Sequence, residues 1–453
     1  MYRGLKGHRD LNNKAIPVNA RIGKLSTKNE GGAQKEYPPF LVFLFLVMAA
    51  YLVLPLIDVP FLGLSLSAPI FALIALQALF APPRPWLHEY RGWILLALLI
   101  WLGVFISAVG NGLLSGGINI DRDGVLTVIR YAYWLLVFVM TAYFASQENI
   151  AERVAGVLGW AVFGLALFRL FEALAWGKIG AWTGTRFLSQ NNYGFLFSTF
   201  FPYLLAPMIS TRGLRRWGMV LRMLAVGAAV IINGSRGSWI GVAAGVLLFA
   251  LIQTLSNPRQ IGVSLLVVLI SALSLAVLNF APYQVTAAFN ERFATLQQLD
   301  EDKSYAIRLL MNQKGLRLFE ESPLIGVGPS RFTKSSTELD IPVLLQYASQ
   351  YHFDSKSAHN SYIAFLAETG LVGSVPFVCL LITLAIKGLK SSIQLARQQQ
   401  FWASGVYVSF LAMSIHMWAI NSLTNTANWF VYGLVAALIH LASCQVENSS
   451  KKI

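Results

Sequence analysis

Apolar residues in this chain fall into runs of about 20 positions, the length that an α-helix needs to cross the ~30 Å hydrocarbon core of a bilayer. Short polar turns separate most of these runs. The pattern predicts an all-α polytopic membrane protein of about twelve transmembrane helices. The predicted spans are 40–57, 61–81, 93–111, 124–145, 154–175, 192–210, 217–233, 237–254, 260–280, 359–387, 403–420 and 427–444.

One connection between spans is much longer than the others. Residues 281–358, between predicted spans nine and ten, mix charges of both signs with Leu, Phe and Tyr. Apolar residues recur near helical spacing from Ala288 to Glu321, so we expect a helix there, ended by the Pro- and Gly-rich turn at 323–329. A loop of this length with its own helices is usually functional. The simpler interpretation is a cap or a docking domain for a partner.

The distribution of charge predicts the orientation. The chain carries a formal net charge of +14, although only 12% of its residues are charged. Lys and Arg gather in the loops that are cytoplasmic if the N-terminus is inside, and the short outer loops carry only Arg122, Lys178, Arg186 and Arg236. The positive charge therefore indicates membrane topology, and we expect no nucleic-acid partner.

The domain organisation follows from these spans. We expect an uncleaved, basic cytoplasmic tail at its N-terminus, because the first apolar run has no small-residue cleavage site after it. The predicted parts are the tail at 1–38, spans one to nine within 39–280, an outer helical loop at 281–358, spans ten to twelve within 359–444, and a cytoplasmic tail at 445–453.

Neither a cofactor nor a metal is expected. Cys379 and Cys444 lie in or near apolar runs, and no Cys/His spacing typical of a metal site is present. Asp121 and Asp123 form a pair that could bind a divalent ion, but two carboxylates two positions apart are a common surface pattern, so we interpret them as structural.

The first candidate for chemistry is His359, where the long loop meets the tenth span. On a straight helix Gly370 lies below His359 on the same face, with Gly373 close to that line. A histidine above a glycine-lined groove suits a headgroup above a lipid tail. Alternatively, the glycines allow close helix packing and His359 is an interfacial cap. The residues alone leave these two interpretations equal.

The second candidate is the tight outer turn Asn233–Ser238, which contains Arg236 between glycines. Open backbone N–H groups and a guanidinium suit an anion such as phosphate, whereas the plain alternative is an arginine that snorkels to the membrane surface. The third is the stretch 185–193, in which Arg186 and Asn191 suit a sugar or a phosphate, although polar loop residues are commonplace.

Charged residues elsewhere are further candidates. The long loop contains Arg292 and Arg308, each with acidic neighbours that could simply pair with it. Within the predicted spans, Arg130, Arg169 and Glu172 are costly in hydrocarbon and could pair inside the bundle. These charges are few and show no repeat symmetry, which disfavours a transporter or flippase.

Three stretches resemble the O-antigen ligase and polymerase superfamily of bacterial envelope glycosyltransferases. They are Gly234–Ser238 before an apolar span, the turn Pro323–Pro329, and His359–Asn360 followed by nine residues and Gly370-Leu-Val-Gly373. The last is the most specific. The resemblance covers residues 185 to 373, and the other spans match in number and layout only.

The resemblance implies a GT-C-like enzyme whose donor is a glycan on undecaprenyl diphosphate at the periplasmic face of the inner membrane. Arg236 and His359 match the family's arginine and histidine, which makes them the predicted catalytic residues. Arg186, Asn191 and Asn360 are predicted to bind substrate. A family Arg-x-x-x-Leu pattern fits Arg292 literally, but Arg308 lies nearer the expected distance from His359, so the loop arginine stays unassigned.

The acceptor separates the functional alternatives. A ligase transfers the glycan to lipid A–core, and the Gly-x-x-Gly spacing after His359 favours it. A polymerase transfers it to a second lipid-linked glycan, and the spacing from Arg317 to Gly328 resembles a polymerase loop. A further variant glycosylates protein hydroxyls. In each case we expect the reaction to invert the anomeric carbon and to need neither a metal nor another cofactor. We also expect the protein to contact membrane lipids.

Overall fold

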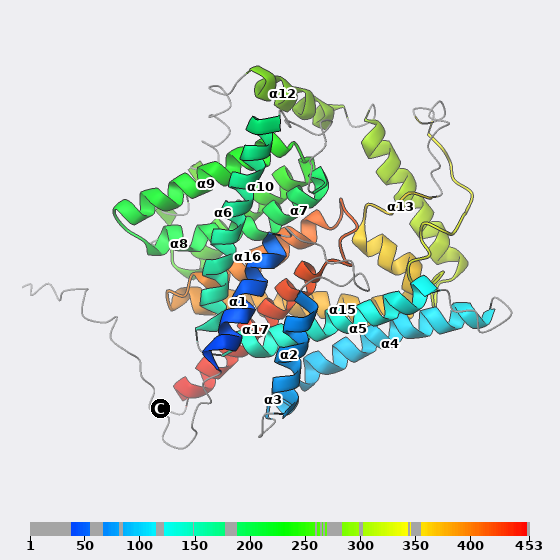
Figure 1. Cartoon of the computed structure of the whole chain (residues 1–453), viewed down its shortest axis with the longest axis horizontal. Coiled ribbons are helices and arrows are strands. Elements are labelled where there is room, and N and C mark those ends of the chain that lie inside the picture. The colour runs from blue at the N-terminus through cyan, green and yellow to red at the C-terminus, as the bar shows by residue number, and fades with distance from the viewer. Residues whose placement is uncertain are drawn as a thin grey trace, which may run out of the picture. The chain divides into compact units, whose positions relative to one another are not determined.

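Helices make up all of the regular structure that the computed structural model describes. The described residues are 38–54, 67–80, 85–114, 122–147, 149–176, 188–258, 261–262, 265, 268–269, 283–298, 302–342, 345 and 355–450. The first half contains α1 (Pro39–Val53), α2 (Ser67–Phe80), α3 (Pro85–Glu89), α4 (Arg91–Leu114), α5 (Arg122–Ala145), α6 (Ile150–Trp176), α7 (Gln190–Phe200), η3 (Phe201–Leu204) and α8 (Leu205–Ser210). The second half contains α9 (Leu214–Asn233), α10 (Arg236–Ser256), α12 (Tyr283–Gln297), α13 (Lys303–Glu321), α15 (Ser361–Arg397), α16 (Trp402–His416) and α17 (Thr426–Ser450) (Figure 1).

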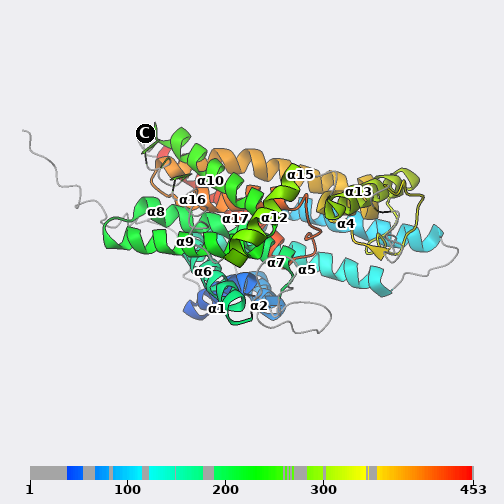
Figure 2. The ribbon, with the colours of Figure 1, turned by 90° about the horizontal axis from the view of Figure 1, so that it is seen from above.

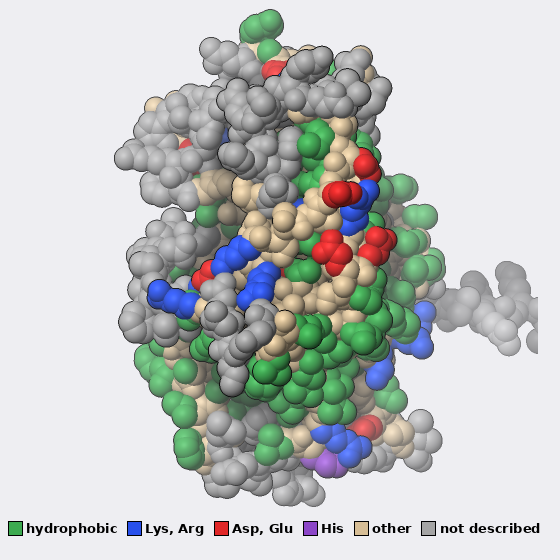
Figure 3. Space-filling view, turned by 90° about the vertical axis from the view of Figure 1, so that its right-hand side faces the viewer, with side chains coloured by type: hydrophobic (Ala, Val, Ile, Leu, Met, Phe, Trp, Pro, Cys, Tyr) green, Lys and Arg blue, Asp and Glu red, His purple; other side chains and the backbone are tan. Residues whose placement is uncertain are grey.

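Eight helical stretches in the described residues are long and apolar enough to cross a membrane. They are α4, α5, α6, α9, α10, α15, α17 and the joined stretch Gln190–Ser210. Figure 3 shows one face on which hydrophobic side chains form a continuous area, with charged side chains gathered beside it. The predicted all-α, multi-pass membrane protein is confirmed.

The exact number of spans stays a prediction. Two shorter apolar helices, Pro39–Val53 and Ala68–Ala78, fall on the first two predicted spans. Helix α16 has 15 residues and falls on the predicted eleventh span, 403–420. Most of the predicted ninth span, 260–280, lies outside the described residues.

Small residues allow the longest helices to approach closely. Helix α4 packs along α15, and α5 packs along α17 (Figures 1 and 2). A Cβ atom on Gly103 of α4 would lie 2.5 Å from the Cα of Gly373 on α15. One on Gly433 of α17 would lie 2.6 Å from the carbonyl oxygen of Phe138 on α5. The interpretation of Gly373 as close packing is therefore correct, and a lipid groove at that glycine is not present.

Helix α15 is not straight, contrary to the expectation used to place His359 above Gly370. Gly370 has φ 58° and ψ −158°, which interrupts the helix. In a continuous helix the amides of residues 371 and 372 would bond to the carbonyls of residues 367 and 368. Here those amides donate to Pro323 and Leu324, while the carbonyls accept from Val327 and Gly328. The turn at 323–328 is thus inserted into the hydrogen-bond ladder of α15.

The sequence predicted one helix from Ala288 to Glu321. The structure has two helices there, α12 and α13, so the prediction of a continuous helix was wrong. Asp302 begins α13 as its N-cap, and its Oδ1 accepts from the amide of Ser304 at 2.9 Å. An N-cap residue has non-helical backbone angles, which separates α13 from the preceding helix. Helix α13 ends at Glu321, directly before the turn that was expected to end it.

The inner face of α13 packs against the start of α15. The shared core contains Leu310, Met311 and Leu318 of α13 with Ala364 and Ala367 of α15, all of them buried. Burial of these side chains holds the described part of the long loop over the beginning of the tenth predicted span.

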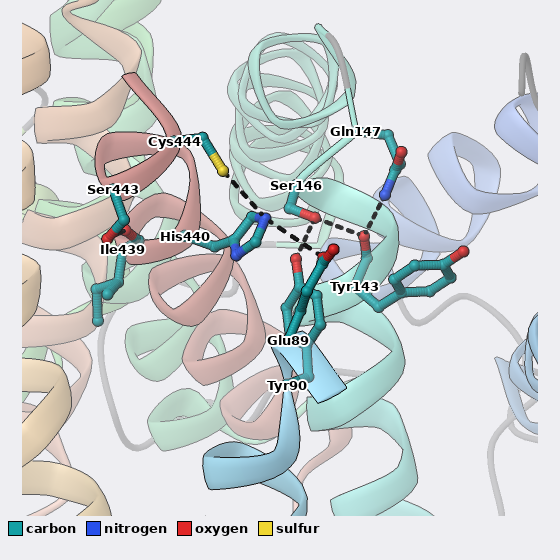
Figure 4. Close-up of polar contacts among 9 residues, drawn as sticks. All are labelled: Glu89, Tyr90, Tyr143, Ser146, Gln147, Ile439, His440, Ser443 and Cys444. Carbon is teal, nitrogen blue, oxygen red and sulfur yellow. Dashed lines mark hydrogen bonds and ion pairs between the residues drawn. The ribbon is translucent and has the colours of Figure 1, made fainter. Parts of the chain in front are cut away.

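A polar cluster joins three elements at the other end of α4 and α5 (Figure 4). Tyr90, just before α4, donates a hydrogen bond to Ser146, just after α5. Its ring lies against that of His440 of α17, with a centroid distance of 4.9 Å and an angle of 32° between the ring planes. Nε2 of His440 lies 3.4 Å from the Cys444 sulfur and 3.9 Å from a Glu89 carboxylate oxygen. Burial raises the pKa of Tyr90, so this hydroxyl stays protonated and keeps donating.

Candidate functional site

The turn that follows α13 is tied to α4 and α5. Asn111 of α4 donates from Nδ2 to the carbonyl of Gly326 at 2.9 Å, and the hydroxyls of Thr127 and Ser330 lie 2.7 Å apart. Lys334 pairs with Asp123 at 2.7 Å. Asp123 therefore has a partner in Lys334, while Asp121 lies outside the described residues.

Arg236 is the first residue of α10. The preceding Gly234 adopts φ 67°, the left-handed conformation that ends α9 and reverses the chain within two residues. Arg236 forms an ion pair with Asp302, and the side chains are only 10% and 9% exposed. One carboxylate oxygen of Asp302 caps α13 and the other pairs with Arg236, so this residue joins the starts of α10 and α13.

His359 lies immediately before the N-cap of α15 and adopts φ 49°. It is half-buried. Burial lowers the pKa of His359, and the positive charges of Arg308 and Lys356 lower it further. The imidazole is therefore neutral at pH 7, the form that accepts a proton.

Sequence reasoning missed His416, the last residue of α16. Its ring is buried against Gly237, where a Cβ atom would lie 3.1 Å from the imidazole Cε1. Its Nδ1 lies 2.9 Å from the Ser198 hydroxyl. The charge of Arg308 acts on His416 as well as on His359. In the sequence His416 is a histidine within an apolar run. That pattern is as consistent with a buried core residue as with a functional one.

Hydrogen bonds join the beginning of α15 to the end of α16. The amide of Ser361 donates to the carbonyl of Met417 at 2.9 Å, and its hydroxyl donates to that of Ile420 at 2.7 Å. Because His416 also contacts the residue after Arg236, the start of α10, the end of α16 and the start of α15 lie together. Arg236 and His359 thus lie at one end of these helices, with Arg308 acting on the histidine from α13.

The other predicted substrate-binding residues have different positions. Asn360 is the N-cap of α15: it is 1% exposed and its Oδ1 accepts from the amides of Tyr362 and Ile363 at 3.1 and 3.2 Å. We therefore assign it a structural role. Asn191 lies in the first turn of α7 and is half-buried. Arg186 and the side chain of Arg292 lie outside the described part of the chain.

The stretch that contains Asn191 lies against the Arg236 turn. Gln190 and Asn233 exchange two hydrogen bonds, at 2.8 and 3.0 Å, between their side-chain amides and main-chain carbonyls. A Cβ atom on Gly194 would lie 2.6 Å from the Ser235 hydroxyl. The second and third sequence candidates are therefore neighbours in space.

A buried charge pair lies near this junction. Arg169 and Glu172 of α6 are both 0% exposed and interact electrostatically. The Arg169 guanidinium also lies 5.8 Å from the ring centre of Tyr193, the residue before Gly194. Two of the three charged residues that were expected to pair inside the bundle, Arg169 and Glu172, thus interact with each other. Their attraction offsets part of the cost of burying two charges.

The fold and this cluster define a multi-pass helical membrane protein with guanidinium and imidazole groups at one end of its helices. A model of the O-antigen ligase family matches residues 221–378, from within α9 to within α15. The matched segment is similar to the O-antigen ligase family and contains Arg236, Arg308 and His359. No curated protein compared with the chain matches it significantly.

Proposed function

We propose that this protein is a glycosyltransferase that moves a glycan from undecaprenyl diphosphate to an acceptor hydroxyl at the periplasmic face of the bacterial inner membrane. Lipid A–core is the acceptor we favour, which makes the protein an O-antigen ligase with both termini in the cytoplasm. The observation that supports the proposal is the match to the O-antigen ligase family over a segment that contains Arg236, Arg308 and His359, with the charge of Arg308 acting on His359.

The chemistry is a single displacement. The acceptor oxygen forms a bond to the anomeric carbon, and the bond from that carbon to the phosphate oxygen breaks. The electron pair leaves with undecaprenyl diphosphate, and the acceptor proton passes to the imidazole of His359 and then to solvent. Attack opposite the leaving group inverts the anomeric centre. The activated diphosphate supplies the driving force, so neither a nucleotide nor a metal takes part.

Arg236 stabilises the leaving diphosphate as negative charge develops on it, with Arg308 and Arg186 as further cations. Electrostatic stabilisation of this kind is often the largest contribution to catalysis. The ion pair with Asp302 holds the Arg236 guanidinium at the start of α10. When the diphosphate binds, it either shares the Arg236 guanidinium with Asp302 or displaces the Asp302 carboxylate from it. Before binding, Asp302 balances the positive charge of Arg236.

A polymerase of the same superfamily is the second candidate. Its sequence support was the spacing from Arg317 to Gly328. In the structure Arg317 donates to the carbonyl of Glu338 at 2.7 Å and pairs with Asp340 at 2.7 Å. Because these bonds give Arg317 a structural use, they favour the ligase. A transporter or flippase is the third candidate and predicts glycan movement without a new glycosidic bond.

The test is complementation of a deletion strain, with profiling of lipopolysaccharide and lipid-linked glycans. Without a ligase, long undecaprenyl-linked chains accumulate, whereas without a polymerase single repeats accumulate. We expect His359→Ala and Arg236→Ala to reduce transfer by about 10²-fold or more at wild-type expression. Matched controls are His88→Ala and Arg215→Ala, since both side chains are exposed and lie outside the site. Full activity in either site variant contradicts the proposed mechanism.

A further inference from the structure

A cavity of about 200 Å³ lies beside the chain that carries His359. Ser357 and Ala358 line it on one side, and Ser361 continues this wall into α15. The turn after α13 forms a second wall, and the segment between α16 and α17 forms a third. The residues on both sides of His359 in the chain thus line the cavity.

The polar groups that line the cavity suit hydroxyl ligands. They include the hydroxyls of Ser330, Thr333 and Thr424, the amide of Asn421 and the carboxylate of Glu368. A carboxyl group accepts hydrogen bonds and, when protonated, also donates one, while hydroxyls and amides both donate and accept. Glu368 accepts hydrogen bonds from the backbone of Ser330 and Phe332, and the bond from the Phe332 amide to Oε1 is 3.2 Å long, so the carboxyl group has a fixed orientation at the cavity.

The remaining lining is aromatic. Tyr131, Phe332 and Phe365 contribute to it, and the rings of Tyr131 and Phe365 lie 5.7 Å apart between centroids. A sugar ring presents hydroxyls at its edge and C–H groups on its face, so it matches a cavity with polar groups and aromatic surfaces. None of the described residues that line the cavity is Lys or Arg, so the cavity offers no cation for the diphosphate.

We infer that this cavity is a subsite for one sugar ring of the acceptor glycan. The volume is below the ~300 Å³ of small drug-sized pockets, so the subsite holds a single ring rather than a chain. The inference rests on the proposed glycosyl transfer, because only then does a sugar have to sit beside His359. A ring of the donor glycan has the same chemistry, and the experiment below distinguishes the two sources.

The first arm measures transfer with purified lipid-linked donor and lipid A–core. Thr333→Trp fills the cavity from its exposed side, and Glu368→Gln keeps the shape but replaces the carboxyl group by an amide. We expect Thr333→Trp to raise the acceptor KM about tenfold or more, the effect of losing one or two hydrogen bonds, with a smaller rise for Glu368→Gln. The donor KM stays unchanged. Ser336→Trp is the matched control, since Ser336 is exposed on the same segment and does not line the cavity.

Two results of this arm overturn the inference. An acceptor KM in Thr333→Trp equal to that of Ser336→Trp shows that no acceptor sugar uses the cavity. A rise in the donor KM instead shows that the ring belongs to the donor.

The second arm needs no catalysis, so it separates failure of the subsite from failure of the proposed function. Binding of methyl hexosides to the protein in detergent micelles is followed by saturation-transfer NMR. We expect a signal in the wild type, in Ser336→Trp and in Arg236→Ala, and its loss in Thr333→Trp. If the wild type transfers no glycan but shows this pattern, the proposed function fails and the sugar subsite stands. A signal that survives in Thr333→Trp, or its absence from the wild type, overturns the subsite.

Discussion

The turn at 323–328 is inserted into the hydrogen-bond ladder of α15, and we call this arrangement the interlock. Replacing Gly370 by alanine tests it. At φ 58° and ψ −158°, Gly370 occupies a backbone region that is essentially restricted to glycine. A Cβ atom there would lie 2.4 Å from the carbonyl oxygen of Leu324 and 2.6 Å from the amide nitrogen of Gly326. Both contacts are with main chain, so rotation of a side chain cannot relieve them.

The expected loss of stability follows from two contributions. Holding alanine in this conformation costs about 1–3 kcal/mol. Moving the turn away weakens the hydrogen bonds from the amides of Leu371 and Val372, which are 2.9 and 3.0 Å long. Each such bond contributes roughly 0.5–1.5 kcal/mol. We therefore expect Gly370→Ala to lower the free energy of unfolding by about 2–6 kcal/mol.

The assay is denaturant unfolding of the purified protein in detergent, followed by tryptophan fluorescence. Gly218→Ala is the matched control: Gly218 lies within α9, and nothing lies within 4 Å of its Cβ position. Alanine there is expected to stabilise by up to about 1 kcal/mol, because it forms helix more readily than glycine. If Gly370→Ala is as stable as this control, the interlock does not contribute to stability and the reasoning is wrong.

Three further predictions concern the site. Since the charge of Arg308 helps to lower the pKa of His359, Arg308→Gln raises that pKa, and the acid limb of the pH–rate profile, where the base becomes protonated, moves to higher pH. If the acid limb of the profile does not move, the charge of Arg308 does not act on His359. Asn360→Ala removes the N-cap of α15 and costs about 1 kcal/mol in denaturant unfolding, whereas Asn360→Asp retains the cap; equal loss in both refutes the capping role. Transfer in excess EDTA continues at the untreated rate, and a loss that Mg²⁺ restores would bring back a metal at Asp123.

Much of the candidate site was predictable because its residues are unusual for their surroundings. Arg236 lies in a short outer turn that should be poor in cations, and His359 lies where a polar loop meets an apolar run. His416 could not be predicted in this way. Its proximity to Gly237 joins residues about 180 positions apart, and that contact depends on the packing of α10 against α16.

Asn360 shows the opposite error. The motif made it a substrate ligand, but its position before an α-helix makes it a cap, and Asn is among the best residues for that purpose. The Gly370–Gly373 pair was open between a lipid groove and close packing. Only the structure could decide, because the partner atoms belong to Leu324 in the distant turn and to Gly103 in another helix.

The sequence by itself determined the all-α membrane class and the family resemblance. Membrane spans follow from the length and composition of local apolar runs, and motifs are read along the chain. The tertiary structure decided the break between α12 and α13, the interruption of α15 and the pairing of Arg236 with Asp302. These features depend on hydrogen bonds and charges between segments far apart in sequence, which no local pattern encodes.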